Sequence, residues 1–227
     1  MVITNRFYID FAKSFTEYLE HHPREIEEYF NAEKYHLGKK IDSGKTALEF
    51  GCGSGRIMEI LAEKCKHVTG IDNSEPLLKI AKENLKYIDN ATFYDPMEVE
   101  ELDKISEKYD IITLMDNTLG NITGRDKQVR LLEKLKPLLN ENGRIIISVY
   151  SDTEDTKRVQ EESYEIVGLT GIKHEGNYTY TNEGLTSERF SEKSIKSLLT
   201  EVGLKAEIEE LTDISYICEA KIISAAQ

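Results

Sequence analysis

The 227-residue sequence contains no tryptophan, three cysteines and four prolines. The cysteines are Cys52, Cys65 and Cys218, an odd number without C-x-x-C spacing, which argues against a disulfide framework and a cysteine-based zinc site. Of the five histidines, only His21 and His22 are close in sequence, and adjacent helical residues point in different directions. We therefore expect no bound metal.

The sequence has fewer basic than acidic residues, with 29 lysines and arginines and 42 aspartates and glutamates, which gives a formal net charge of −13. This sign argues against general nucleic-acid binding, which needs a basic surface. No apolar run approaches the ~20 residues that a membrane span needs. Charged residues interrupt residues 1–15, which therefore lack a signal-peptide core. We expect a cytoplasmic protein that binds neither nucleic acid nor membrane, and the sequence leaves its oligomeric state open.

At roughly 150 residues per domain, the length favours a single domain over residues 1–227. In residues 1–40, apolar positions at helical spacing are interrupted at Pro23, which predicts two short helices that form an N-terminal cap. Residues 168–190 form a polar stretch rich in glycine and tyrosine that follows neither the helical nor the strand period. We interpret this stretch as a β-excursion that covers the substrate.

The middle of the chain alternates between short apolar segments and helical patterns, which predicts an α/β fold. Right-handed crossovers between such strands give a doubly wound, mostly parallel sheet with helices on both faces. The last two apolar segments are joined by a short turn and predict an antiparallel hairpin at the sheet edge. The predicted strands are 46–50, 67–71, 91–94, 109–114, 144–150, 204–211 and 215–223, and one of the helices is predicted at 126–139.

In a doubly wound sheet the ligand crevice lies beyond the carboxyl ends of the strands. The first predicted strand runs into a glycine-rich segment, Glu49-Phe50-Gly51-Cys52-Gly53-Ser54-Gly55. Glycines let the backbone approach a ligand closely, although a tight turn alone also explains them. Arg56 replaces the small residue of a dinucleotide fingerprint, and the P-loop lysine is absent. Glu49 is a carboxylate on a buried strand, so it needs a cation or hydrogen-bond donors, which suits an ammonium or sulfonium ligand.

The next strand ends carry further acceptors. Asp72 follows the second strand, where it is placed to accept both hydroxyls of a ribose, although helix capping is the simpler alternative. Asp95, Pro96 and Met97 follow the third strand and offer a carboxylate and apolar groups to an adenine. The fourth strand is followed by an unusually polar segment, residues 115–121.

These motifs together resemble the class I S-adenosylmethionine-dependent methyltransferases, over about residues 45–223. The resemblance rests on the glycine-rich segment 48–55, the acidic segment 70–74 and the strand 109–112. In addition, residues 190–199 with 202–204 resemble the late helix and edge strand of small-molecule members. The resemblance implies a seven-stranded sheet, S-adenosylmethionine (SAM) as cofactor and S-adenosylhomocysteine (SAH) as product.

The resemblance also implies roles for individual residues. Glu49 and the glycine segment would hold the methionyl part, Asp72 the ribose, Asp95 with Met97 the adenine, and Met115 with Asp116 the sulfonium end. The implied cofactor residues are Tyr8, Glu49, Gly51, Cys52, Gly53, Gly55, Asp72, Asn73, Asp95, Pro96, Met97, Met115 and Asp116. Tyr8 belongs to a segment that resembles an N-terminal Tyr-Asp-x-x-Ala element, except that Ile9 separates Tyr8 from Asp10.

Substrate residues carry a weaker signal. Residues 116–121 slightly resemble glycine N-methyltransferase-like enzymes, which makes Asn117 and Asn121 candidates. Tyr178 and Tyr180 lie two residues apart and share a face if their segment is a strand, with simple packing as the alternative. His174 and Arg189 are candidates for contact with an acidic or polar substrate, although a surface position fits them better.

Three functions fit these observations. The first is a SAM-dependent methyltransferase that acts on a small-molecule N or O nucleophile by in-line transfer, because the chain is acidic and has little room for a recognition domain. The second is a tRNA or protein methyltransferase, although residues 116–119 replace the Asn-Pro-Pro-Tyr or Asp-Pro-Pro-Tyr motif of base methylators. The third is a non-catalytic SAM-binding scaffold. No catalytic base is assigned, and Asp116 or a tyrosine fits that role better than any histidine.

Overall fold

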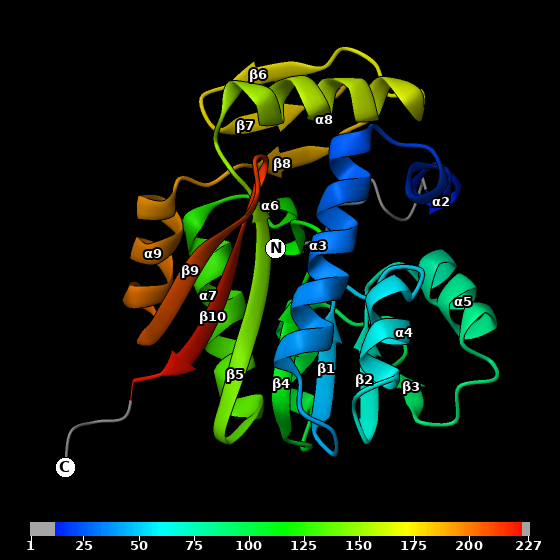
Figure 1. The fold of residues 1–227 in the computed structure, drawn as a ribbon, viewed down its shortest axis with the longest axis vertical. Helices are drawn as coiled ribbons and strands as arrows, with labels where there is room; N and C mark the ends of the chain where they lie inside the picture. Colours follow the sequence, from blue (N-terminus) through cyan, green and yellow to red (C-terminus); the bar gives the residue numbers. More distant parts are fainter. Residues whose placement is uncertain (1–11, 224–227) are drawn as a thin grey trace.

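The computed structural model describes residues 12–223, and one twisted sheet forms its centre (Figure 1). Its seven strands lie in the order β3-β2-β1-β4-β5-β10-β9. Strands β1 to β5 are parallel, whereas β10 is antiparallel to both β5 and β9. The predicted doubly wound sheet with an antiparallel edge hairpin is therefore confirmed. The strands are β1 (Thr46–Phe50), β2 (His67–Ile71), β3 (Ala91–Phe93), β4 (Tyr109–Leu114), β5 (Leu139–Tyr150), β9 (Leu204–Thr212) and β10 (Ser215–Ile222).

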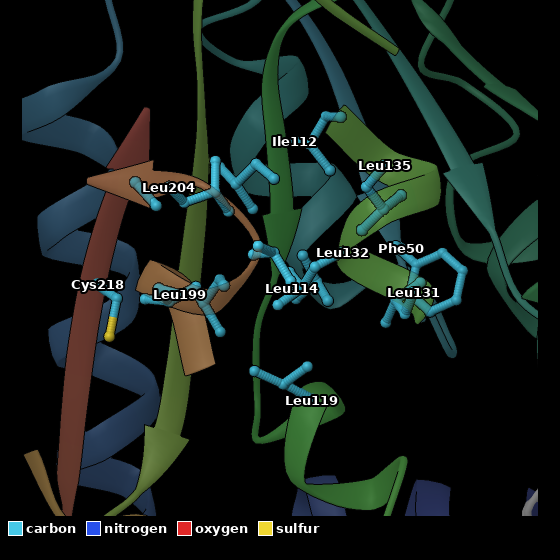
Figure 2. Packing of buried hydrophobic residues seen from close by; sticks show 14 of the residues in the cluster. Phe50, Ile112, Leu114, Leu119, Leu131, Leu132, Leu135, Leu199, Leu204 and Cys218 are labelled. Atoms are coloured by element: carbon cyan, nitrogen blue, oxygen red, sulfur yellow. The ribbon is translucent and has the colours of Figure 1, made fainter. Parts of the chain in front are cut away.

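Helices cover both faces of the sheet because successive strand residues point to opposite sides. Ile112 on β4 packs into one buried cluster, whereas its neighbour Ile111 packs into the other. The first cluster holds side chains of α7 (Arg125–Leu135), α9 (Glu192–Glu201) and the 3₁₀ helix η1 (Val99–Lys104), and Figure 2 shows the α7 leucines against the sheet. The second cluster holds side chains of α3 (Arg24–Lys40), α4 (Arg56–Ala62) and α5 (Glu75–Asn84).

The N-terminal part of the described chain contains two helices, as the break at Pro23 predicts. Helix α2 (Ala12–Glu20) precedes Pro23, and α3 follows it. The helix predicted for 126–139 is wrong at its end, because α7 stops at Leu135 and continues as the short 3₁₀ helix η2 (Lys136–Leu138). Pro137 explains this, since its ring has no N–H and clashes with the preceding turn of an α-helix.

The excursion at residues 168–190 forms a second sheet of three short antiparallel strands, β6 (Lys173–Glu175), β7 (Tyr178–Tyr180) and β8 (Thr186–Glu188). It lies with α8 (Glu154–Ile166) beyond the end of β5, at the top of Figure 1. We call α8 with residues 167–190 the lid. The predicted β-excursion is present in the structure. No helix among residues 12–223 is long and apolar enough to cross a membrane.

Arg189 holds the lid together from inside. Its side chain is fully buried and donates to Gln160 Oε1 of α8 at 2.9 Å, to the Gly176 carbonyl at 3.0 Å and to Asp152 Oδ1 at 3.3 Å. A further hydrogen bond goes to the Thr179 hydroxyl. The sequence-based expectation of a surface or substrate-contacting position for Arg189 is therefore wrong, because the guanidinium satisfies acceptors that the lid buries.

Candidate functional site

A pocket opens at the carboxyl ends of the parallel strands, where the strand order changes direction between β1 and β4. This is the place where doubly wound sheets bind their ligands. Its walls come from the glycine-rich loop 51–54, from the ends of β1, β2 and β4, from helix α2 and from the lid. Three of the predicted acidic residues at the strand ends, Glu49, Asp72 and Asp116, line this pocket together.

The glycine-rich loop needs its glycines. Gly51 has φ 76°, and a Cβ atom there would lie 2.6 Å from the Thr118 methyl carbon. Gly53 has φ 51°, and Gly55 has φ 92° as the residue that precedes α4. Only glycine adopts such angles without strain. The loop thereby turns sharply after β1, and Gly51 and Gly53 line the pocket wall without side chains.

Cys52 lies inside this loop and also lines the pocket. Burial raises the pKa of its thiol well above the usual value, and the charge of Asp72 adds to this effect. A thiol that stays protonated is a poor nucleophile. Cys52 therefore acts as a small wall residue.

Asp72 is fixed at the end of β2 by backbone amides. Its Oδ2 atom accepts from the Gly53 N–H at 2.9 Å, and its Oδ1 atom accepts from the Ser74 N–H at 2.8 Å. Ser74, rather than Asp72, is the N-cap of α5, because the Ser74 side chain accepts from the Leu77 N–H. Burial raises the pKa of Asp72 although these amides lower it. Asp72 and Asn73 both line the pocket with acceptor capacity to spare.

Glu49 is a buried carboxyl group on β1. The Thr113 hydroxyl of β4 donates to its Oε2 atom, which supplies one of the donors that its position requires. Burial nevertheless raises the pKa of Glu49 to about 8, and the nearby Arg56 and the Met115 amide only partly oppose this. An ionised Glu49 is therefore under-compensated, and a cation in the pocket would stabilise it.

A second buried carboxyl group, Glu33 of α3, lies at the same end of the pocket and was not found from the sequence. Its Oε2 atom accepts from Arg56 Nη2 at 2.6 Å, and its Oε1 atom accepts from the Asp116 N–H at 2.8 Å. The Ser148 hydroxyl also donates to Oε1 and itself accepts from Tyr29 at 2.9 Å. Although burial lowers the pKa of Arg56, the Glu33 and Asp116 charges raise it above its usual value. The sequence contains one signal for this network, because Arg56 stands where a dinucleotide fingerprint has a small residue.

Asp116 and Asn117 follow β4 in a left-handed conformation, with φ 50° and 55°. Non-glycine residues adopt it only where the surroundings hold them. The Asp116 amide is held by Glu33 and also donates to Ser148 Oγ at 2.9 Å. Asn117 accepts from the Tyr150 N–H at 3.0 Å and donates to Ser187 Oγ of the lid at 2.9 Å. This loop therefore aims the Asp116 side chain, which lines the pocket.

Not every residue predicted for the site reaches the pocket. Asp95 and Pro96 are exposed and do not line it, whereas Met97 does, together with the neighbouring Glu98, which sequence reasoning missed. The chain turns after the three residues of β3, with the Met97 N–H donating to the Asp72 carbonyl at 3.1 Å, and this bond carries Met97 inward. Met115 also lines the pocket.

The candidate substrate residues divide in the same way. Asn121 lines the pocket, but Asn117 does not, because its side chain is buried and hydrogen-bonded to the lid. Tyr178 and Tyr180 are stacked on each other with ring centroids 6.1 Å apart and do not line the pocket. Three other tyrosines line it instead, Tyr18, Tyr150 and Tyr164. Tyr8 lies outside the described residues.

A sequence profile of the methyltransferase domain family matches residues 41–203 of this chain. The chain belongs to this family. The prediction of a class I SAM-dependent methyltransferase is thereby confirmed, and SAM is the cofactor of the family. The match covers the whole region from the glycine-rich loop through the lid.

Individual relatives resemble different lengths of the chain. The ubiquinone biosynthesis O-methyltransferase of Coxiella burnetii is 33% identical over 105 residues, which cover 46% of this chain and 43% of that protein. The chain thus matches less than half the length of this relative. An uncharacterised methyltransferase of Anoxybacillus flavithermus is 24% identical over 216 residues, 93% of this chain and 94% of the relative.

Solved structures share the fold. The complex of DhpI with SAM and HEP has a TM-score of 0.70 at 16% identity and covers 95% of this chain and 94% of its own. A SAM-dependent methyltransferase from Clostridium acetobutylicum has a TM-score of 0.66 at 15% identity, with 95% and 98% covered. At these identities the likeness concerns the fold alone.

Proposed function

We propose that the protein transfers a methyl group from SAM to a nitrogen or oxygen nucleophile of a small molecule by in-line displacement. The observation that carries this proposal is the pocket at the switch point, where Glu49 and Asp72 from neighbouring strands flank the glycine-rich loop. The profile match and the name of the Coxiella relative support the same reaction class.

The residues around the pocket fit SAM. Asp72 keeps free acceptor positions for the ribose hydroxyls, since the backbone amides bonded to it use only part of the capacity of its two oxygens. The under-compensated Glu49 matches the ammonium and sulfonium charges of the methionyl end. Met97 and Val99 provide an apolar wall for the adenine, with Glu98 beside them as an acceptor. Glu98 replaces Asp95 in this proposal because Asp95 is exposed.

When bound, SAM supplies an electrophilic methyl carbon whose bond to sulfur breaks with the electron pair left on sulfur. The chain contributes orientation and the exclusion of water. We propose that residues 1–40 and 168–190 provide this cover, because Phe15, Tyr18 and Leu19 of α2 and Leu169 and Leu185 of the lid line the pocket. A cytoplasmic location remains the expectation from the sequence.

We expect Asp72→Ala to weaken SAM and SAH binding by about 1–3 kcal/mol, since it removes hydrogen bonds to a charged acceptor. This corresponds to roughly a 5- to 150-fold rise in Kd, measured by titration calorimetry. Asp89→Ala, an exposed carboxylate in the loop after α5, is the matched control with unchanged affinity. Absence of SAH binding to the unmodified protein at millimolar ligand would disprove the cofactor assignment.

The pocket carboxyls predict a pH dependence of cofactor binding. Burial raises the pKa of Glu49 to about 8, so this group contributes stability that is fully present below its unfolded pKa and is lost as pH rises through about 8. The SAM cation compensates the ionised form of Glu49. The extra thermal stabilisation by SAM over the uncharged-sulfur product SAH should therefore grow between about pH 6 and pH 8.5, by up to about 1.4 kcal/mol per pH unit per proton. A constant difference contradicts this prediction.

Turnover decides between the proposed function and its alternatives. Labelled SAM is offered with a panel of small amines and phenols, with bulk tRNA and with bulk protein, and the labelled product is identified by mass. Label in a small molecule supports the proposal. Label only in RNA or protein replaces it with the macromolecular alternative, and binding of SAM without any product favours the scaffold alternative.

A further inference from the structure

Beyond the proposed cofactor residues, the pocket is lined by aromatic side chains around a carboxyl group. Tyr18 comes from α2, Tyr150 from the end of β5 and Tyr164 from α8. The hydroxyl oxygens of Tyr18 and Tyr150 lie 3.0 Å apart in a hydrogen bond. Burial raises the pKa of all three hydroxyl groups, and the charge of Asp116 contributes to each. We call Tyr18, Tyr150, Tyr164 and Asp116 the aromatic cage.

The charges at this end of the pocket do not cancel. Glu33, Glu49 and Asp116 supply three carboxyl groups, against the one guanidinium of Arg56. Arg56 is the only lysine or arginine among the pocket-lining residues that the structure describes. Its guanidinium is already bonded to Glu33 at 2.6 Å and lies 4.0 Å from the centre of the Phe30 ring. Arg56 is therefore unavailable to an anionic substrate.

Bound SAM leaves part of this negative charge uncompensated. Its ammonium and sulfonium outweigh its carboxylate by one positive charge, whereas the three carboxyls outweigh Arg56 by two negative charges when ionised. One negative charge remains, and Asp116 is the carboxyl group whose charge acts on all three tyrosines of the cage. Within residues 12–223, no side chain or backbone amide donates a hydrogen bond to the Asp116 carboxylate.

We propose that the substrate is a small amine with an apolar body, whose protonated nitrogen lies in the aromatic cage against the Asp116 carboxylate. This inference rests on the proposed function. The faces of tyrosine rings attract a cation, most strongly when water is excluded. Val167, Leu169 and Leu185 of the lid supply an apolar wall for the body of the molecule. Asp116 would repel an anionic carboxylate or phosphonate.

The same arrangement provides the proton transfer that an amine requires. An ammonium nitrogen has no free electron pair, so its proton first moves to the Asp116 carboxylate. The freed pair then forms the bond to the methyl carbon as the carbon–sulfur bond breaks and its pair remains on sulfur. A carboxyl group whose pKa burial raises to about 7 is suited to accept this proton near neutral pH.

Three probes of similar size test the preference. The protein is first saturated with SAH, and phenethylamine, 4-ethylphenol and phenylacetate are then titrated separately by calorimetry at neutral pH. We expect phenethylamine to bind at least about tenfold more tightly than the other two, because one charge-assisted hydrogen bond provides an affinity difference of this size. Methyl transfer to phenethylamine from labelled SAM is the second readout.

Substitutions assign this preference to the cage. Asp116→Asn should weaken phenethylamine binding about tenfold or more, while 4-ethylphenol binding changes little. Tyr164→Leu should also weaken it, whereas Tyr164→Phe, which retains the ring face, should keep most of the affinity. SAH affinity is measured for each variant and shows that the fold is intact.

The outcomes separate this inference from the proposed function. The amine inference is overturned if phenylacetate or 4-ethylphenol binds as tightly as phenethylamine, if phenethylamine does not bind at millimolar concentration, or if Asp116→Asn leaves its affinity unchanged. In each of these cases SAH still binds and the methyltransferase assignment stands. Loss of SAH binding by the unmodified protein would instead remove the proposed function itself.

Discussion

Replacement of Glu33 by alanine is expected to lower the free energy of unfolding by about 3–5 kcal/mol, the usual cost of breaking a buried ion pair from one side. Glu33 is fully buried and bonded to Arg56 at 2.6 Å, so its removal leaves the guanidinium in the pocket wall without its anionic partner. The Asp116 amide loses an acceptor at the same time, which releases a left-handed backbone. Urea denaturation followed by circular dichroism measures the loss.

Two controls make this expectation specific. Glu28 lies on the same helix, half of its side chain is exposed, and its pairing with Arg24 is at the surface, so Glu28→Ala should cost less than about 1 kcal/mol. The double replacement Glu33→Leu with Arg56→Met removes both charges and should recover most of the stability. If Glu33→Ala is no more destabilising than Glu28→Ala, the buried pair does not hold this end of the fold.

Arg189→Leu is expected to have the second largest effect, a loss of about 3 kcal/mol. The substitution leaves the Gly176 carbonyl without its donor inside the lid, and it removes one of the two donors to Gln160 Oε1, which keeps the Thr179 hydroxyl. An unsatisfied buried acceptor costs about 1–3 kcal/mol. Because these bonds lie within the lid, the loss should be local. Hydrogen exchange should accelerate in residues 173–188 while the strands of the main sheet keep their protection.

The matched control for this change is Arg158→Leu. Arg158 also belongs to the lid, on helix α8, but its side chain is more than half exposed, and its ion pairs with Glu25 and Glu162 are at the surface. We expect it to change stability by less than about 1 kcal/mol. Equal effects of the two substitutions, or faster exchange throughout the main sheet, would contradict the assignment of Arg189 as the internal support of the lid.

The local pattern of the sequence was enough to predict the architecture. Alternating apolar strands and helical segments predicted the parallel sheet, and the turn between 204–211 and 215–223 predicted the edge hairpin. Such signals depend on a residue and its near neighbours, which is why they are readable without a structure. The helix end at Leu135 was missed because the pattern continued while Pro137 broke the geometry.

The strand-end rule also predicted much of the candidate site. Glu49, the glycines and Asp72 line the pocket because parallel strands bring their carboxyl ends to the same edge. Asp95 does not line the pocket, because after a strand of only three residues the tertiary packing sets the direction of the next turn. The roles of Glu49, the glycines and Asp72 toward SAM are predictions, which the Asp72→Ala measurement tests for Asp72.

By itself, the sequence determined the order of the elements, the glycine-rich loop and the acidic strand ends, because these follow from short-range periodicity and backbone chemistry. Only the tertiary structure decided which side chains meet across long separations. Glu33 reaches Ser148 over 115 positions, and Tyr18 reaches Tyr150 over 132. Those contacts depend on where α2 and α3 pack against the end of the sheet, and packing is a property of the whole chain. The aromatic cage, and with it the proposed preference for an amine, exists only at that level.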